Sequence, residues 1–108
     1  MTAAVAWSLL AFTVALEVAG TSMLKLAEGF QKPLWFFAAI ASYCVCFALL
    51  ATILKVLPLS VTYAVWAGAG AAAVTAIDVF IFGQPLSLFK IACIGLIIAG
   101  VVGLKLSG

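Results

Sequence analysis

Residues 13–25 read TVALEVAGTSMLK, and they place one carboxylate, Glu17, inside a run of residues suited to hydrocarbon. The run extends in both directions, from about residue 3 to residue 24. A helix needs roughly 20 apolar residues to cross a membrane, so we predict a transmembrane helix over 3–24. Ionisable groups inside a membrane are costly, and Glu17 is therefore the first residue that needs a functional explanation.

The rest of the chain has the same character. Of its 108 residues, 69% are hydrophobic and only 7% are charged, which is typical of an integral membrane protein. Three further apolar runs lie at about 34–54, 59–82 and 86–104, separated by short breaks that contain proline, glycine or lysine. The alternating pattern of a membrane β-barrel is absent. We predict an all-α membrane protein with a single four-helix transmembrane domain over residues 1–108.

Several function classes find no support in the sequence. The chain has no histidine, and its three cysteines, Cys44, Cys46 and Cys93, form no C-x-x-C pair, so we interpret them as packing residues within helices. No candidate nucleophile is paired with a base. We therefore expect no metal site, no cofactor and no enzymatic activity.

The lysines leave the orientation in the membrane open. Lys25, Lys32 and Lys90 fall on one side of the predicted helices and Lys55 and Lys105 on the other, so the positive-inside rule gives almost no preference. Such a chain can insert both ways, and two copies in opposite orientations can form an antiparallel, dual-topology homodimer. The alternative is a weak bias, set by the first loop, that fixes one orientation.

The last predicted helix offers a candidate assembly surface. Gly95, Ala99 and Gly103 recur at intervals of four, which places small residues on one helical face and allows another helix to approach closely.

Polar residues cluster around Glu17. At helical spacing Thr13, Gly20 and Thr21 share its face, so this face combines a carboxylate, two hydroxyls and a position without a side chain. A low-dielectric environment disfavours the charged carboxylate, and either a proton or a bound cation neutralises it. Competition between the two for one site is the physical basis of proton-coupled antiport. The structural alternative is a protonated glutamate that only bonds neighbouring helices.

The third apolar run contains an aromatic pair. Tyr63 and Trp66 lie three residues apart on one helical face, and Gly68 and Gly70 weaken the helix just beyond them. Aromatic faces attract desolvated quaternary ammonium groups, and Tyr43 in the second run can add a hydroxyl. Plain packing is the alternative interpretation of this pair.

Four segments together resemble the small multidrug resistance transporter family, over essentially the whole chain and in order. The first is Glu17-Val18-Ala19-Gly20-Thr21, followed by Lys25 and by Glu28-Gly29-Phe30. The other three are Tyr63 to Gly70, Phe82-Gly83-Gln84, and Leu96 to Val101. The resemblance implies an antiparallel homodimer that exchanges protons for toxic cations across the bacterial inner membrane.

The resemblance also assigns roles to individual residues. Glu17 matches the carboxylate shared by proton and substrate, and Gly68 and Gly70 match a hinge. The residues that match positions lining the binding chamber are Thr21, Tyr43, Tyr63 and Trp66. Those that match the family's dimer interface are Leu96, Ile97, Gly100 and Val101. Cys93 and Ala67 depart from the family pattern, because a glycine and a hydroxyl residue are usual there.

Within the family, Gly20 favours the branch that exports quaternary ammonium and other lipophilic cations, because the guanidinium-exporting branch commonly carries a tryptophan there. Residues 84–86 and 103–105 look partly like the guanidinium branch. Asp78 fits neither pattern, and it can reach the membrane interface, attract cations or mark one subunit of a heterodimeric pair. A non-transporting subunit and a lipid or metabolite carrier are further alternatives, although no lysine lies mid-helix to bind an anion.

Overall fold

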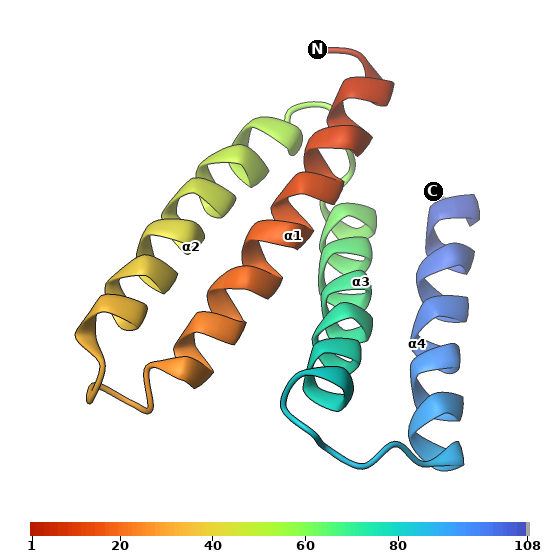
Figure 1. The fold of residues 1–108 in the computed structure, drawn as a ribbon. Helices are drawn as coiled ribbons and strands as arrows, with labels where there is room; N and C mark the ends of the chain where they lie inside the picture. Colours follow the sequence, from red (N-terminus) through yellow and green to blue (C-terminus); the bar gives the residue numbers. More distant parts are fainter. Residues whose placement is uncertain (108) are drawn as a thin grey trace. The chain divides into compact units, whose positions relative to one another are not determined.

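The computed structural model describes residues 1–107 as four α-helices, with no strand among these residues. They are α1 (Ala3–Leu26), α2 (Pro33–Ile53), α3 (Leu59–Phe80) and α4 (Leu88–Ser107) (Figure 1). Each is long and apolar enough to cross a membrane. The predicted all-α fold with four membrane spans is confirmed, whereas the antiparallel dimer stays a prediction.

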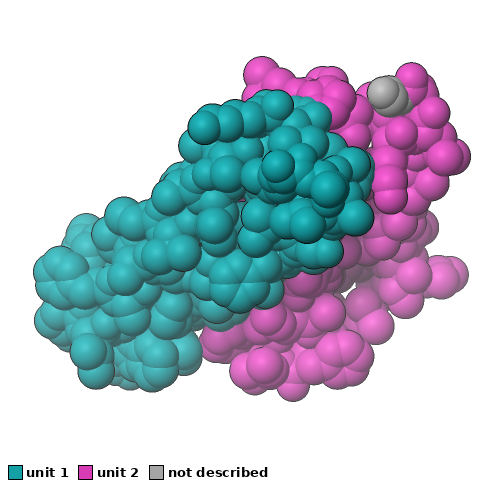
Figure 2. Space-filling view, turned by 90° about the horizontal axis from the view of Figure 1, so that it is seen from above, with its two compact units in different colours: residues 1–57 teal, residues 58–108 magenta. Residues whose placement is uncertain are grey.

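The helices form two compact units, coloured separately in Figure 2. The first, Met1–Leu57, contains α1 and α2, and the second, from Pro58 onward, contains α3 and α4. Each unit is a helical hairpin whose two helices are consecutive in the sequence. The single domain over residues 1–108 stays a prediction.

A seam of mostly small residues joins α1 to α2. Buried residues recur at intervals of seven on both helices: Ala6, Thr13 and Gly20 on α1, and Ala39, Cys46 and Ile53 on α2. A spacing of seven keeps one face of a helix turned toward its partner over several turns. Since lipid and side chains are equally apolar, close backbone approach and hydrogen bonds must stabilise this pair, and small residues permit both.

The turn between α1 and α2 depends on two residues with left-handed backbone conformation. Glu28 has a φ of 49° and Gly29 a φ of 74°, which together reverse the chain. The N–H of Lys32 donates to the carbonyl of Ala27 across the turn at 3.0 Å. Pro33 then starts α2 at a position where its missing N–H is not needed.

In the second unit, α3 runs unbroken through both Gly68 and Gly70, and both glycines are buried. A Cβ at Gly68 would overlap Cγ2 of Val101 on α4 and lie 3.3 Å from Cγ2 of Ile97. The missing side chain therefore lets α4 approach α3 at this point. By contrast, none of the residues Leu88–Ser107 of α4 is buried.

The turn between α3 and α4 ends α3 two residues before the expected 59–82 and starts α4 two residues after the start of the expected 86–104. Gly83 has a φ of 73°, and the N–H of Gln84 donates to the carbonyl of Asp78 at 3.0 Å, which ends α3 at Phe80. Ser87 Oγ accepts from the N–H of Lys90 at 3.1 Å, an N-cap bond that starts α4 at Leu88.

Candidate functional site

The carboxyl group of Glu17 is satisfied on one oxygen only. Thr21 lies one turn further along α1, and its Oγ1 donates to Glu17 Oε1 at 3.0 Å. The other oxygen, Oε2, is buried and has no hydrogen-bond partner within the described part of the chain. An unsatisfied buried acceptor costs roughly 1–3 kcal/mol, and more when it is charged. This oxygen is therefore where a bound cation stabilises the site most.

Tyr43 reaches the same group from α2. Its hydroxyl lies 2.6 Å from Thr21 Oγ1, and either oxygen can donate. Glu17, Thr21 and Tyr43 therefore form one chain of three hydrogen-bonding groups across the α1–α2 seam. All three were predicted as site residues, and the first unit brings them together.

Gly20 has a different environment from the one expected. A glycine on the same helical face as Glu17 predicts free volume beside the carboxylate. Instead the ring of Tyr43 fills the space, and a Cβ at Gly20 would lie 3.0 Å from Cε1 of that ring. The packing of α2 against α1 explains the difference, because the seam brings the tyrosine onto the exposed backbone of Gly20.

Thr13, also predicted for the site, is fully buried and uses its hydroxyl within its own helix. Its Oγ1 donates to the carbonyl of Leu10 at 2.7 Å. In an α-helix the carbonyl of Thr13 is the partner of the N–H of Glu17. Thr13 thus lies directly under the carboxylate, as part of the backbone that supports it.

Two residues of α2 that the sequence analysis did not assign to the site hold this backbone from the other side. Ser42 Oγ donates to the carbonyl of Leu16 at 2.7 Å, and Cys46 Sγ donates to the carbonyl of Thr13 at 3.4 Å. Ser42 and Cys46 are four residues apart and therefore share a face. That spacing, with Tyr43 between them, was the only signal in the sequence that could have identified them.

The aromatic pair belongs to the second unit. The rings of Tyr63 and Trp66 lie 6.1 Å apart at an angle of 48°, so the two side chains share a face as predicted. Tyr63 is 64% exposed and Trp66 is half-buried. The nearby Thr62 is buried, and its Oγ1 has no hydrogen-bond partner among the described residues. The union of this pair with Glu17 in one binding chamber stays a prediction.

The residues expected at the dimer interface divide into two groups. Ile97 and Val101 lie against Gly68 of the same chain. Leu96 is 74% exposed, and a Cβ at Gly100 would meet nothing within 4 Å. The second group is therefore accessible to a partner, while the first also supports α3. The dimer and the hinge at Gly68 and Gly70 both stay predictions.

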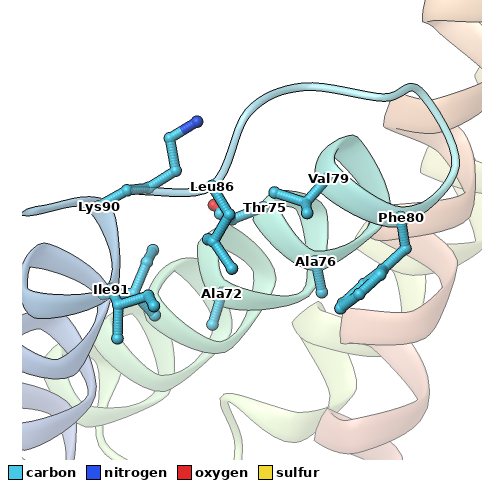
Figure 3. Close-up of a pocket in the computed structure, with 9 residues that line it drawn as sticks. Ala72, Thr75, Ala76, Val79, Phe80, Leu86, Lys90 and Ile91 are labelled. Atoms are coloured by element: carbon cyan, nitrogen blue, oxygen red, sulfur yellow. The ribbon is translucent and has the colours of Figure 1, made fainter. Parts of the chain in front are cut away.

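A cavity of about 190 Å³ lies at the turn between α3 and α4. Figure 3 shows its lining, which comes from α3, the start of α4 and the connecting loop. The walls are apolar apart from Thr75 and Lys90, and Lys90 Nζ donates to the carbonyl of Pro85 at 3.0 Å. None of the predicted site residues lines this cavity, and the sequence analysis did not anticipate it.

Comparison with known proteins places these features in a family. Residues 5–97 match the family described as Small Multidrug Resistance protein. The quaternary ammonium compound-resistance protein QacG of a Staphylococcus species is 44% identical over 97 residues, covering 89% of this chain and 90% of QacG.

Two further relatives come from other bacteria. The multidrug transporter PA4990 of Pseudomonas aeruginosa is 39% identical, over 90% of this chain and 88% of the relative. The multidrug resistance protein EbrB of Bacillus licheniformis is 46% identical, over 85% of this chain and 77% of the relative. With four helices able to span a membrane, the chain belongs to the Small Multidrug Resistance protein family, as a multi-pass protein of the bacterial inner membrane.

Proposed function

We propose that this chain is a proton-coupled antiporter that exports lipophilic and quaternary ammonium cations, with Glu17 as the shared site for proton and substrate. As a member of a family of multidrug resistance exporters, the chain is a transporter rather than an enzyme. The proton coupling, the role of Glu17 and the dimer are what we propose beyond family membership.

One observation carries it, the half-satisfied carboxyl group in the middle of α1. Oε1 of Glu17 accepts from Thr21, while Oε2 is buried and unpartnered in the described structure. In a membrane-spanning helix such a carboxylate needs a counter-charge or a proton. A proton and a cation cannot both neutralise the same charge, so binding of one favours release of the other.

The side chains predicted for the site favour cations that lack hydrogen-bond donors. Phenol and indole rings attract such cations through their faces, and the chain supplies them at Tyr43, Tyr63 and Trp66. A guanidinium ion, in contrast, is recognised by paired hydrogen bonds to a carboxylate. The relative QacG, which is named a quaternary ammonium compound-resistance protein, points the same way.

We further propose that the transporting species is an antiparallel homodimer. The five lysines give little orientation preference, no residue of α4 is buried, and Leu96 and Gly100 are exposed. Two copies in opposite orientations would contribute two Glu17 side chains and present equivalent surfaces to both sides of the membrane.

The test is transport by the purified chain in proteoliposomes under an imposed proton gradient. Ethidium serves as the fluorescent lipophilic cation, and benzyltrimethylammonium and guanidinium serve as competitors. We expect gradient-driven ethidium uptake, stronger competition by benzyltrimethylammonium than by guanidinium, and loss of uptake in Glu17→Gln, which keeps the volume but loses the charge.

Glu28→Gln is the matched control, because Glu28 is exposed in the turn between α1 and α2. Its Oε1 lies 3.6 Å from Nζ of Lys32. We expect it to transport normally. Gradient-driven uptake by Glu17→Gln would refute the role of Glu17, and tighter binding of guanidinium than of benzyltrimethylammonium would assign the chain to guanidinium export.

A further inference from the structure

We propose that Gly20 is a positioning residue: it lets the ring of Tyr43 lie where its hydroxyl can bond to Thr21, which in turn bonds to Glu17. Through this chain of hydrogen bonds, the protonation state of Glu17 sets the direction in which the Tyr43 hydroxyl donates. This inference rests on the proposed function, because it assumes that Glu17 gains and loses a proton during transport. It assigns to Gly20 a role other than making room for substrate.

The geometry at Gly20 supplies the first step. A Cβ there would lie 3.0 Å from Cε1, 3.2 Å from Cζ and 3.3 Å from Cδ1 of Tyr43. Real Cβ atoms rarely approach so closely, so a side chain at position 20 must displace the ring by some tenths of an ångström. Cζ is the carbon that bears the hydroxyl, and displacing it moves the oxygen that lies 2.6 Å from Thr21 Oγ1.

The surroundings limit how the ring can respond. Ser42 is bonded to the carbonyl of Leu16 at 2.7 Å, which fixes this turn of α2 against α1. The ring of Tyr43 also stacks on Phe47, with centroids 6.3 Å apart and an angle of 28°. A new side chain at Gly20 therefore acts mainly on the tyrosine ring rather than on the spacing of the helices.

The second step is a count of protons. Thr21 has one hydroxyl proton and two partners, Glu17 and Tyr43. When Glu17 is ionised it can only accept, so Thr21 donates to it and Tyr43 must donate to Thr21. When Glu17 is protonated on Oε1 and donates to Thr21, the proton of Thr21 turns to Tyr43, whose own proton is then directed elsewhere.

This reversal changes what Tyr43 offers to a cation. With Glu17 ionised, the phenol proton is engaged and only oxygen lone pairs remain, which favours a nearby cation. With Glu17 protonated, the phenol presents its proton instead and disfavours the cation. The hydroxyl chain thus strengthens the competition between proton and substrate beyond the charge of Glu17 alone.

Few other ionisable groups on α1 and α2 could make cation binding depend on pH. Helix α2 carries no charged residue, and its titratable groups besides Tyr43 are Cys44, which is exposed, and Cys46, which is buried and donates to Thr13. On α1 the other charged group is Lys25 in the last turn. The pH dependence of cation binding should therefore report Glu17 and its hydroxyl chain.

The experiment measures ethidium binding to the purified full-length chain in detergent across a range of pH. A hydrogen bond to a charged acceptor is worth roughly 1 kcal/mol or more, so weakening the chain disfavours ionised Glu17. We expect Gly20→Ala, Tyr43→Phe and Thr21→Val each to weaken ethidium binding about fivefold near neutral pH and to change the pH profile of binding. Thr21→Ser, which keeps the hydroxyl, should bind ethidium with the same pH profile as the native protein.

The decisive comparison is the double variant Gly20→Ala with Tyr43→Phe. If Gly20 acts through the tyrosine hydroxyl, the double variant should bind no more weakly than Tyr43→Phe alone. Full additivity would overturn the inference and return Gly20 to direct contact with substrate. A native profile in Tyr43→Phe would overturn it independently of how Gly20→Ala folds.

Two controls separate this inference from the proposed function. Ala19→Ser adds one heavy atom at the exposed neighbour of Gly20 and should keep the native profile. Ethidium binding that is independent of pH in the native protein, or unchanged in Glu17→Gln, would refute the role of Glu17 itself. A pH-dependent native protein with additive variants would refute only the role of Gly20.

Discussion

Replacing Gly68 by alanine tests the closest helix contact of the second unit. The added Cβ would overlap Cγ2 of Val101 and lie 3.3 Å from Cγ2 of Ile97. Both partners belong to α4, so the variant must either rotate the side chain of Val101 or push α4 away from α3. Loss of the close contact between Gly68 and Val101 should destabilise the α3–α4 hairpin.

The expected magnitude has two opposing parts. Alanine favours a helix interior over glycine by about 1 kcal/mol, whereas overpacking of a close contact costs about 1–3 kcal/mol. Gly95→Ala on α4 isolates the first part, since a Cβ there would meet nothing within 4 Å. We therefore expect the free energy of unfolding of Gly68→Ala to lie about 1–3 kcal/mol below that of Gly95→Ala.

The assay is unfolding in mixed micelles with increasing SDS, followed by tryptophan fluorescence. Val101→Ala removes the overlapping atom, so it should restore much of the loss in the Gly68→Ala background while destabilising the native protein. Equal stability of Gly68→Ala and Gly95→Ala would refute the contact. So would a loss on Val101→Ala that is the same in both backgrounds.

Three further predictions concern topology, electrostatics and the α1–α2 seam. Two or three lysines added to the loop at 54–58 should force one orientation and abolish transport, and co-expression of an oppositely biased version should restore it; normal transport by the forced protein alone would exclude the antiparallel dimer. Asp78→Asn should weaken cation affinity roughly twofold at low salt and hardly at high salt, as screening predicts for a steering charge; complete loss of transport at every salt concentration would instead place Asp78 in the coupling machinery. Ser42→Ala should lower the free energy of unfolding by about 1 kcal/mol or less, because the carbonyl of Leu16 keeps its partner within α1; a much larger loss in the SDS titration would contradict this.

The sequence predicted the four helices well because the length of an apolar run is itself the signal for a membrane span. It also predicted that Glu17 and Thr21 share a face, and the family resemblance added Tyr43, which the first unit brings to them. Two of these residues lie one turn apart on the same helix, and helical periodicity alone brings their side chains together.

The environment of Gly20 could not be predicted in the same way. It depends on the register of α2 against α1, and α2 is apolar on every side, so no polar face indicates which residues meet α1. The bonds from Ser42 and Cys46 to backbone carbonyls were hidden for the same reason. A glycine beside a carboxylate looks like free volume until the opposite helix is in place.

The division of the chain at Leu57 and Pro58 has a consequence for how the protein is made. Every hydrogen bond described above joins residues within one hairpin, and the longest of them spans 33 positions in the sequence. Contacts so local form quickly, because little chain must be closed into a loop before they are made. The first hairpin, with its glutamate, threonine and tyrosine, can therefore assemble during synthesis, before the ribosome has added the second.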